Sequence, residues 1–300
     1  MRNPHNAVNR IPRAVSTGRV VQASLLTAIR DDPSLLEPVQ ALLRQQPSQG
    51  FTENQVLSAR LRVSALLQAS TDAPPRPGLQ PSLFQAWADA SGDPDTVLAQ
   101  WLRTGAPLGI LNAVAPTGIF PTVPEASPNP EQIQDLASLP QGWVNYRSSE
   151  DEPIITDSIL QSMVSKQWAT CCDTWDHLVS ELGSDQITLN KLALVSKQKP
   201  DGTWKHRVVW DLRRSQVNAS VRQGERVVLP RLLDVVNDIC HLARASPDST
   251  ISMLGTHIAD AFHQVPLDPS EWRFTVASFQ GRFYVFRVLV FGSALSLIHI

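Results

Sequence analysis

Proline is the residue that most constrains this chain, because it is concentrated in one stretch. Of the 23 prolines, 13 lie between residues 74 and 153. Proline lacks a backbone N–H and clashes with the preceding helical turn, so a run this dense does not belong to a compact helical core. The stretch predicts linkers and extended connections between an N-terminal and a C-terminal region.

Charge divides the chain in a similar way. The total is 26 Lys and Arg against 28 Asp and Glu, a formal net charge of -2. Residues 1–190 hold 12 basic and 19 acidic side chains, whereas residues 191–300 hold 14 and 9. The near-neutral total argues against a wholly basic nucleic-acid coat protein, while the basic last third favours an anionic partner for that part of the chain.

The first hundred residues carry signals for separate helices. Thr52 followed three positions later by Gln55 is a capping box and predicts a helix start. The apolar face of that helix is predicted to consist of Val56, Leu57, Leu61, Val63, Leu66 and Leu67. A second helix is predicted from Asp93, as the N-cap before a proline, to Gly105 just past its end. A third start at Asp32 is expected to be interrupted by Pro38.

A long helix is predicted to follow the proline-rich stretch. Thr156 is its expected N-cap and Gly183 its expected end, with Cys171 and Cys172 packed along it. With Cys240 there are three cysteines, which form neither an even disulfide framework nor a metal-binding CxxC pattern. This cysteine usage favours a reducing, intracellular compartment.

From residue 191 the pattern becomes β-rich. The runs KLALVSK and HRVVWDL flank turn residues at 200–202 and predict a hairpin, and RFTVASF and RFYVFRVLVF around Gln280 and Gly281 predict another. Between them, LPRLLDVVNDICHLA predicts a helix opened by Pro230, and ISMLGTHIADAF predicts a buried strand that runs into a loop. The fold class is therefore expected to be α+β.

Three segments of this region occur in the order expected of a known family. KPDGTWKHRVVWDLR, ADAFHQVPL and VFGSAL resemble the fingers hairpin, the turn after the first catalytic carboxylate and the template-gripping segment of retroelement reverse transcriptases. The resemblance implies a partial right-hand polymerase, fingers and palm, over residues 191–294. Residues 1–125 are then a helical, proline-rich leader and residues 126–190 a linker and helical lead-in.

The resemblance assigns roles to individual residues. Arg207 is the residue that contacts the triphosphate, with Lys199 or Lys197 as its lysine partner. The turn at Asp260, Ala261 and Phe262 holds the triphosphate through backbone N–H groups, and Phe262 excludes a ribose 2′-hydroxyl. Trp204 and Arg213 are the expected nucleic-acid contacts, although Trp204 and Trp210 are each equally suited to packing. The implied partners are an RNA or DNA primer-template and deoxynucleoside triphosphates, with Mg²⁺ as cofactor.

Two departures from the family predict that this chain does not polymerise. His257 stands where the family has its first metal-binding aspartate, and Mg²⁺ prefers oxygen ligands over a neutral imidazole. The nearby Ile258 backbone remains as an oxygen donor, but no intact metal site is expected. The later Asp-Asp motif is also absent, and no acidic residue follows Glu271. Residues 295–300, LSLIHI, match a translated sequencing-library adapter and are interpreted as an artefact.

Two alternatives stay open. In one, the chain is a non-catalytic nucleic-acid-binding remnant whose basic hairpin contacts the phosphate backbone. In the other, it is a helical interaction protein whose leader binds a partner. No apolar run long enough for a membrane span is present, so no membrane partner is expected.

Overall fold

The structure is a computed structural model that describes residues 10–44, 50–70, 79–122, 144–226, 228, 231–245, 247–248, 251, 258 and 260–293. Its contacts divide the chain into two compact units. Unit 1 comprises Met1–Ala106 with Thr117–Ile119, and unit 2 comprises Pro107–Pro116 with Phe120–Ile300. The boundaries predicted at residues 125 and 190 stay predictions, because a division by contacts does not say what each part does.

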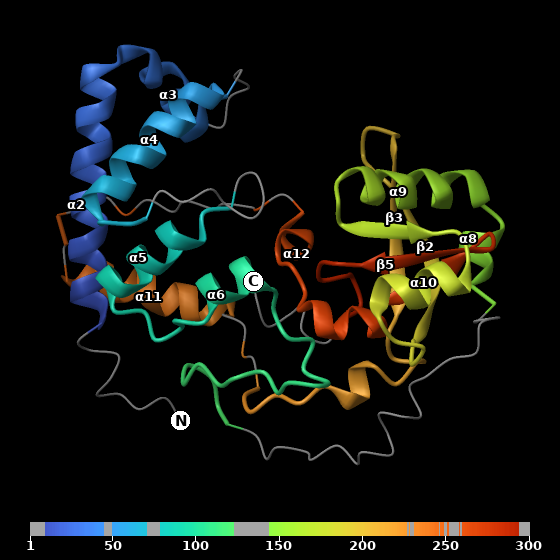
Figure 1. The fold of residues 1–300 in the computed structure, drawn as a ribbon. Coiled ribbons are helices and arrows are strands. Elements are labelled where there is room, and N and C mark those ends of the chain that lie inside the picture. Colours follow the sequence, from blue (N-terminus) through green and yellow to red (C-terminus); the bar gives the residue numbers. More distant parts are fainter. Residues whose placement is uncertain are drawn as a thin grey trace. The chain divides into compact units, whose positions relative to one another are not determined.

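Unit 1 is helical (Figure 1). Its elements are α2 (Arg10–Asp31), η1 (Pro33–Leu35), α3 (Leu36–Leu43), α4 (Glu53–Leu66), α5 (Pro81–Ser91) and α6 (Leu98–Thr104). Helix α2 contacts both α4 and α5. The Arg13 guanidinium on α2 donates to the carbonyls of Asp89 and Ala90 at 2.7 and 2.9 Å, which links the start of α2 to the end of α5.

The capping box that begins α4 is confirmed. Thr52 Oγ1 accepts from the Gln55 backbone N–H at 3.3 Å, and Gln55 Oε1 accepts from the Thr52 N–H at 2.9 Å. The predicted apolar face of this helix is wrong for most of its members. Val63 is buried, whereas four of the others are exposed: Val56, Leu57, Leu61 and Leu66.

The other corrections in unit 1 concern where helices begin and where prolines lie in them. Helix α6 begins after Val97 and not at Asp93, whose carboxylate instead accepts from the Asp95 N–H at 2.9 Å in a turn. Pro38 does not interrupt its helix, because it lies in the first turn of α3, where a backbone N–H has no intrahelical partner. Pro81 likewise opens α5, a helix inside the stretch predicted to be linkers.

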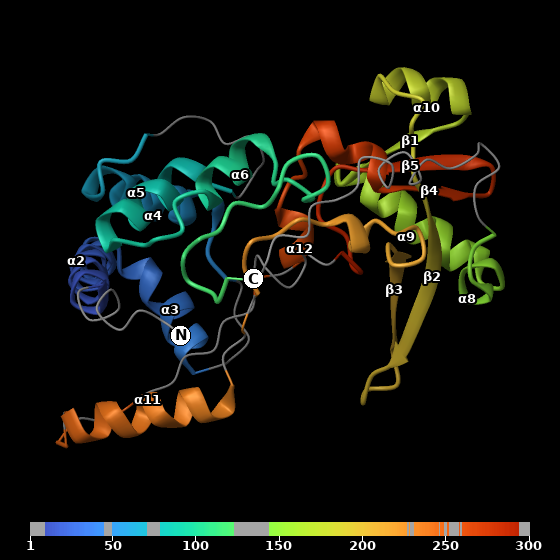
Figure 2. The same ribbon diagram turned by 90° about the horizontal axis from the view of Figure 1, so that it is seen from below.

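Unit 2 contains a five-stranded mixed sheet in the order β1-β5-β4-β2-β3. Its strands are β1 (Ala169–Cys172), β2 (Leu189–Gln198), β3 (Trp204–Asp211), β4 (Val276–Phe279) and β5 (Arg282–Phe286). Every pairing is antiparallel except β2 with β4. Both predicted hairpins, β2–β3 and β4–β5, are confirmed, and the fold is mixed α and β. Figure 2 shows the β2–β3 hairpin extending away from the other strands.

The long helix predicted over residues 156–183 is wrong. Helix α9 (Pro153–Ser165) ends before Gln167, whose φ of 59° breaks the helix, and α10 (Trp175–Leu182) begins after strand β1. Thr156 lies inside α9, while Gly183 ends α10 in the left-handed conformation as predicted. The cysteines at 171 and 172 lie on β1, so the prediction that they pack along a helix is also wrong.

Helices α9 and α10 lie on opposite faces of the sheet. Cys172 packs with Leu178 of α10, whereas the neighbouring Cys171 pairs with Tyr284, whose hydroxyl contacts Gln161 of α9 at 3.2 Å. Side chains alternate between faces along a strand, so these contacts assign one helix to each face. Helix α9 also contacts β3.

The remaining elements of unit 2 are short, apart from one helix. They are α8 (Arg147–Glu150), η2 (Asn218–Ser220), α11 (Leu232–Ala245), α12 (Ala261–Gln264) and η3 (Pro269–Phe274). Helix α11 confirms the helix predicted after Pro230, and its residues Leu232 and Leu233 are exposed. The strand predicted over 251–262 and the segment 295–300 lie wholly or mostly outside the described residues. None of the described helices is long and apolar enough to cross a membrane.

A buried carboxylate fixes the beginning of unit 2. Glu271 is fully buried and accepts from the backbone N–H groups of Leu108, Ile110 and Leu111, with a distance of 2.8 Å to Ile110. Burial raises the pKa of Glu271, while these backbone donors act in the opposite direction. Arg222 donates to the carbonyls of Ile110 and Leu111 at 3.0 and 2.6 Å. Residues 107–116 are therefore held to the rest of unit 2 through their backbone N–H groups, which Glu271 accepts from, and through their carbonyl groups, which accept from Arg222.

Candidate functional site

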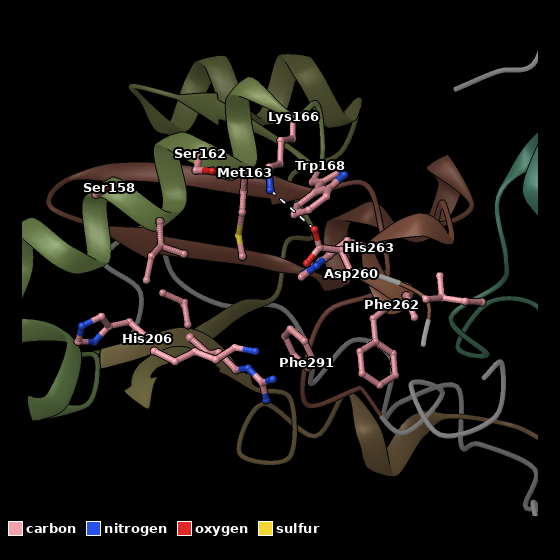
Figure 3. A pocket seen from close by; sticks show the side chains of 16 residues that line it. Ser158, Ser162, Met163, Lys166, Trp168, His206, Asp260, Phe262, His263 and Phe291 are labelled. Atoms are coloured by element: carbon pink, nitrogen blue, oxygen red, sulfur yellow. Dashed lines mark ion pairs between the residues drawn. The ribbon is translucent and has the colours of Figure 1, made fainter. Parts of the chain in front are cut away.

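A cavity of about 820 Å³ lies between α9, the edge strand β3 and α12 (Figure 3). It contains side chains from segments far apart in the sequence. The lining residues are Ser158, Ile159, Ser162, Met163, Lys166, Trp168, Lys205, His206, Arg207, Val208, Ile258, Asp260, Ala261, Phe262, His263 and Phe291. Arg207 and the turn 260–262, assigned to one function from separate motifs, therefore line the same cavity.

The β2–β3 hairpin extends this cavity with a cationic surface. The strand register places Lys197 opposite Lys205 and Val195 opposite Arg207. These four residues, together with Lys199 and Pro200, line a second hollow of about 450 Å³. Like charges directly opposed across a strand pair are unfavourable unless an anion compensates them. Lys205 and Arg207 border both hollows, so they connect the hairpin surface to the larger cavity.

Phe291 links Arg207 to the turn. The Arg207 guanidinium lies 5.4 Å from the centroid of the Phe291 ring, and the ring of Phe262 meets the same ring edge-on at 5.0 Å. The following residue, Gly292, has a φ of 107°, and a Cβ atom there would lie 2.2 Å from the Trp210 carbonyl oxygen. Only glycine permits this close approach, which positions Phe291 beside β3.

Asp260 occupies an unusual backbone conformation. Its φ and ψ are 50° and 36°, in the left-handed region, and it precedes α12 without its side chain capping that helix. The carboxylate lies 3.8 Å from Lys166 Nζ, and both side chains are about half exposed. Among the described residues that line the cavity, Asp260 is the sole acid.

His263 forms the buried wall of the cavity. Its ring stacks on Trp168 with centroids 4.5 Å apart and meets Phe291 edge-on at 5.2 Å. Burial lowers the pKa of His263 to about 4, and the positive charge of Lys166 acts in the same direction. The imidazole is therefore neutral at pH 7, so the cavity's charge comes from Lys166, Lys205, Arg207 and Asp260.

Of the other predicted residues that the structure describes, Ile258 alone lines the larger cavity. Lys197 and Lys199 line the hairpin hollow, and Arg213 is exposed beyond the end of β3. Trp204 is 57% exposed, with the ring of His206 at 6.4 Å, whereas Trp210 is 1% exposed and packs against Phe286. This difference assigns Trp210 to packing and leaves Trp204 available for contact. His257 lies outside the described residues, while Ile258 lines the cavity.

The described residues do not fit the magnesium site that the family resemblance implies. No group of three or more His, Cys, Asp or Glu residues suited to a metal ion occurs among them. Asp260 supplies the sole carboxylate among the described residues that line the cavity, and Mg²⁺ requires several oxygen ligands. We therefore derive no step through a metal ion.

Sequence reasoning missed the wall formed by α9. Ser158, Ser162 and Lys166 are spaced four residues apart, so they lie along one helix face, and this polar row was the available signal. All three residues lie inside the helix predicted from residue 156, but the sequence does not show that this face borders a cavity with β3 and α12. Comparisons of the chain with protein-family models, with curated proteins and with solved structures find no match.

Proposed function

We propose that this chain carries the fingers and part of the palm of a retroelement reverse transcriptase. In this proposal it binds a deoxynucleoside triphosphate and a primer-template. The observation that carries the proposal is the convergence of Arg207 with Asp260, Ala261 and Phe262 on one cavity. These residues come from separate motifs, and no local sequence rule requires them to meet.

The chemistry of the cavity supports a polyphosphate ligand. Guanidinium and ammonium groups form strong, charge-assisted hydrogen bonds with phosphate oxygens. Arg207 and Lys205 belong to both hollows, and Lys197 and Lys199 continue the cationic surface along the hairpin. The aromatic rings of Phe262 and Phe291, which meet edge-on, supply apolar surface suited to contact with a sugar or base.

The same residues argue against polymerisation by this chain. Transfer of a nucleotidyl group depends on metal ions held by carboxylates, which neutralise the developing charge. His257 stands where the resemblance places the first of these carboxylates, and Asp260 is the sole acid among the described residues that line the cavity. We propose that the parent enzyme performs RNA-directed DNA synthesis and that this chain binds without catalysing it.

The test is a pair of titrations with matched variants. Wild-type protein is titrated with a deoxynucleoside triphosphate by calorimetry and with a fluorescent primer-template by anisotropy. We expect Arg207→Gln to weaken triphosphate binding about tenfold or more, as expected for loss of a charge-assisted contact. Lys191→Gln is the control, because Lys191 lies on β2 with its ammonium over Tyr146 at 5.0 Å and lines neither hollow.

Equal binding by wild type and Arg207→Gln would overturn the proposed site. Primer extension separates binding from catalysis, and we expect no product from this chain. Extension by the unmodified protein would contradict the argument from His257. Phe262→Ala should reduce the preference for deoxynucleotides over ribonucleotides, which direct titration of both ligands measures.

A second function, non-catalytic nucleic-acid binding, is favoured by the exposed Trp204. An indole beside a cationic hairpin is suited to stacking on a single-stranded base. This alternative predicts salt-dependent binding of a single strand without binding of a free triphosphate. The two titrations described above therefore distinguish the two functions.

A further inference from the structure

The cavity has a third cation near Arg207 and Lys205, and it comes from outside the recognised motifs. Lys166 lies one residue beyond the end of α9, after Ser158 and Ser162 on the same helix face. Figure 3 shows its side chain reaching toward Asp260. No motif identified in the sequence includes this lysine, so its place in the cavity is known from the fold alone.

Lys166 has two weak partners in the cavity. Its ammonium lies 3.8 Å from the Asp260 carboxylate and 4.3 Å from the centroid of the Trp168 ring. The side chains of Lys166 and Asp260 are 49% and 52% exposed. An ion pair this long and this exposed contributes little, because solvent screens it. The Lys166 ammonium can therefore leave Asp260 and Trp168 for a more highly charged anion with little loss of free energy.

The net positive charge of the cavity favours movement of Lys166 from Asp260 to a bound anion. Lys166, Lys205 and Arg207 are opposed by Asp260, and His263 is neutral at pH 7. A phosphate group carries more charge than a single carboxylate and offers several acceptor oxygens. Lys166 therefore gains both charge and hydrogen bonds by moving from Asp260 to a phosphate oxygen.

We propose that Lys166 is a phosphate-binding residue that is held by Asp260 when the cavity is empty and released to the ligand when a polyphosphate binds. The ligand class is an inorganic or nucleoside polyphosphate. This inference rests on the proposed function, since it uses the same cavity, but it assigns a role to α9 that the polymerase-like motifs do not contain.

A second explanation makes an opposite prediction. If the Lys166–Asp260 pair only holds the turn before α12 in its left-handed conformation, loss of either side chain disturbs the cavity equally. If Lys166 binds the ligand, Asp260 competes for its ammonium, and Asp260→Asn strengthens binding. The sign of the effect at Asp260 therefore separates ligand binding from positioning.

The experiment is calorimetric titration of the full chain with inorganic pyrophosphate at pH 7. We expect Lys166→Gln to weaken binding about threefold to tenfold, and Asp260→Asn to strengthen it about twofold to fivefold. Lys166→Arg should retain most of the affinity because it keeps the charge. Lys191→Gln, the control outside both hollows, should bind as wild type does. Thermal unfolding checks that each variant is folded.

The outcomes distinguish this inference from the proposed function. If Arg207→Gln loses binding and Lys166→Gln does not, the proposed function stands and the role of Lys166 is refuted. If Asp260→Asn weakens binding as much as Lys166→Gln, the pair is structural and the inference fails. If Lys191→Gln weakens binding equally, the loss reflects the lower net positive charge of the protein and not a specific contact. That result also overturns the proposed role of Lys166. Absence of pyrophosphate binding by the wild type would refute the role of Lys166, whereas the proposed function is decided by the separate titration with a deoxynucleoside triphosphate.

Discussion

The two ends of the β2–β3 hairpin differ sharply, although they belong to the same pair of strands. At the base, Leu192 and Trp210 face each other in register and are buried. At the tip, Gln198 faces Trp204, and both side chains are exposed. One strand therefore has a tryptophan in the core and another in solvent. The base resembles ordinary sheet packing, while the tip displays cations and an aromatic ring without burying them.

This difference indicates that the base of the hairpin stabilises the fold and that the tip is available for ligand binding. Burying a large aromatic side chain stabilises a fold, whereas leaving one exposed gives no such gain. Changes at the base should therefore alter stability, and changes at the tip should alter ligand binding.

The largest effect is expected from the pair of tryptophans. Trp210→Ala should lower the free energy of unfolding by about 3–5 kcal/mol, because it empties a packed position against Phe286. Trp204→Ala should change it by less than about 0.5 kcal/mol, as surface substitutions usually do. Urea unfolding measures both. Similar losses from the two variants would show that the hairpin is buried along its whole length.

Two glycines with positive φ give the next comparison. Gly292→Ala should cost about 3 kcal/mol, because the new Cβ would overlap the Trp210 carbonyl oxygen and the backbone conformation disfavours alanine. Gly202→Ala, in the turn at the tip, should cost about 1 kcal/mol from backbone strain alone, since nothing lies within 4 Å of its Cβ position. Thermal unfolding of both variants tests the difference. An unaffected Gly292→Ala protein would contradict the close packing of residue 292 against β3.

His263 tests the buried side of the cavity through pH. Burial lowers its pKa to about 4, below the usual value of 6.5, so the unfolded chain binds the proton more readily between these values. The contribution of His263 to the free energy of unfolding is fully present above pH 6.5. It falls by up to about 3 kcal/mol as the pH falls toward 4. His263→Phe should lose less stability than wild type between pH 7 and pH 4.5. Parallel pH profiles for the two proteins would mean that His263 is not buried.

The smallest effect concerns the exposed tip and nucleic acid. Trp204→Ala should weaken binding of a single-stranded oligonucleotide by about 1–3 kcal/mol if the indole stacks on a base. Arg213→Gln, beyond the other end of β3, should reduce the salt dependence of binding without a comparable loss of affinity. Anisotropy titrations at several salt concentrations measure both quantities. Unchanged affinity in Trp204→Ala would remove the evidence that the tip contacts bases.

Local signals explain which parts of the fold were predictable. Pro200, Asp201 and Gly202, and the pair Gln280 and Gly281, are residues that favour turns, so both hairpins followed from the sequence. The capping box at Thr52 was equally local. The buried face of α4 could not be predicted from local signals. It depends on how the helix packs against other helices, which its own apolar pattern does not specify.

The error over residues 156–183 has a different physical cause. A short apolar run such as Trp168 to Cys172 suits either a helix or a buried strand, and pairing with β5 decides the outcome. Lys166 was missed for another reason, since its place in the cavity depends on how α9 packs beside β3 and the turn before α12. Arg207 and Phe262 were selected from the family resemblance, but their shared contact with Phe291 depends on the fold.

We propose that the β2–β3 hairpin and the turn before α12 form one ligand-binding site. Hydrogen–deuterium exchange of the full chain with and without a deoxynucleoside triphosphate tests this proposal. We expect the ligand to slow exchange in residues 204–209 and in residues 260–264 at the same ligand concentration, and we expect Arg207→Gln to abolish both effects. Protection confined to one segment, or located in neither, would contradict it.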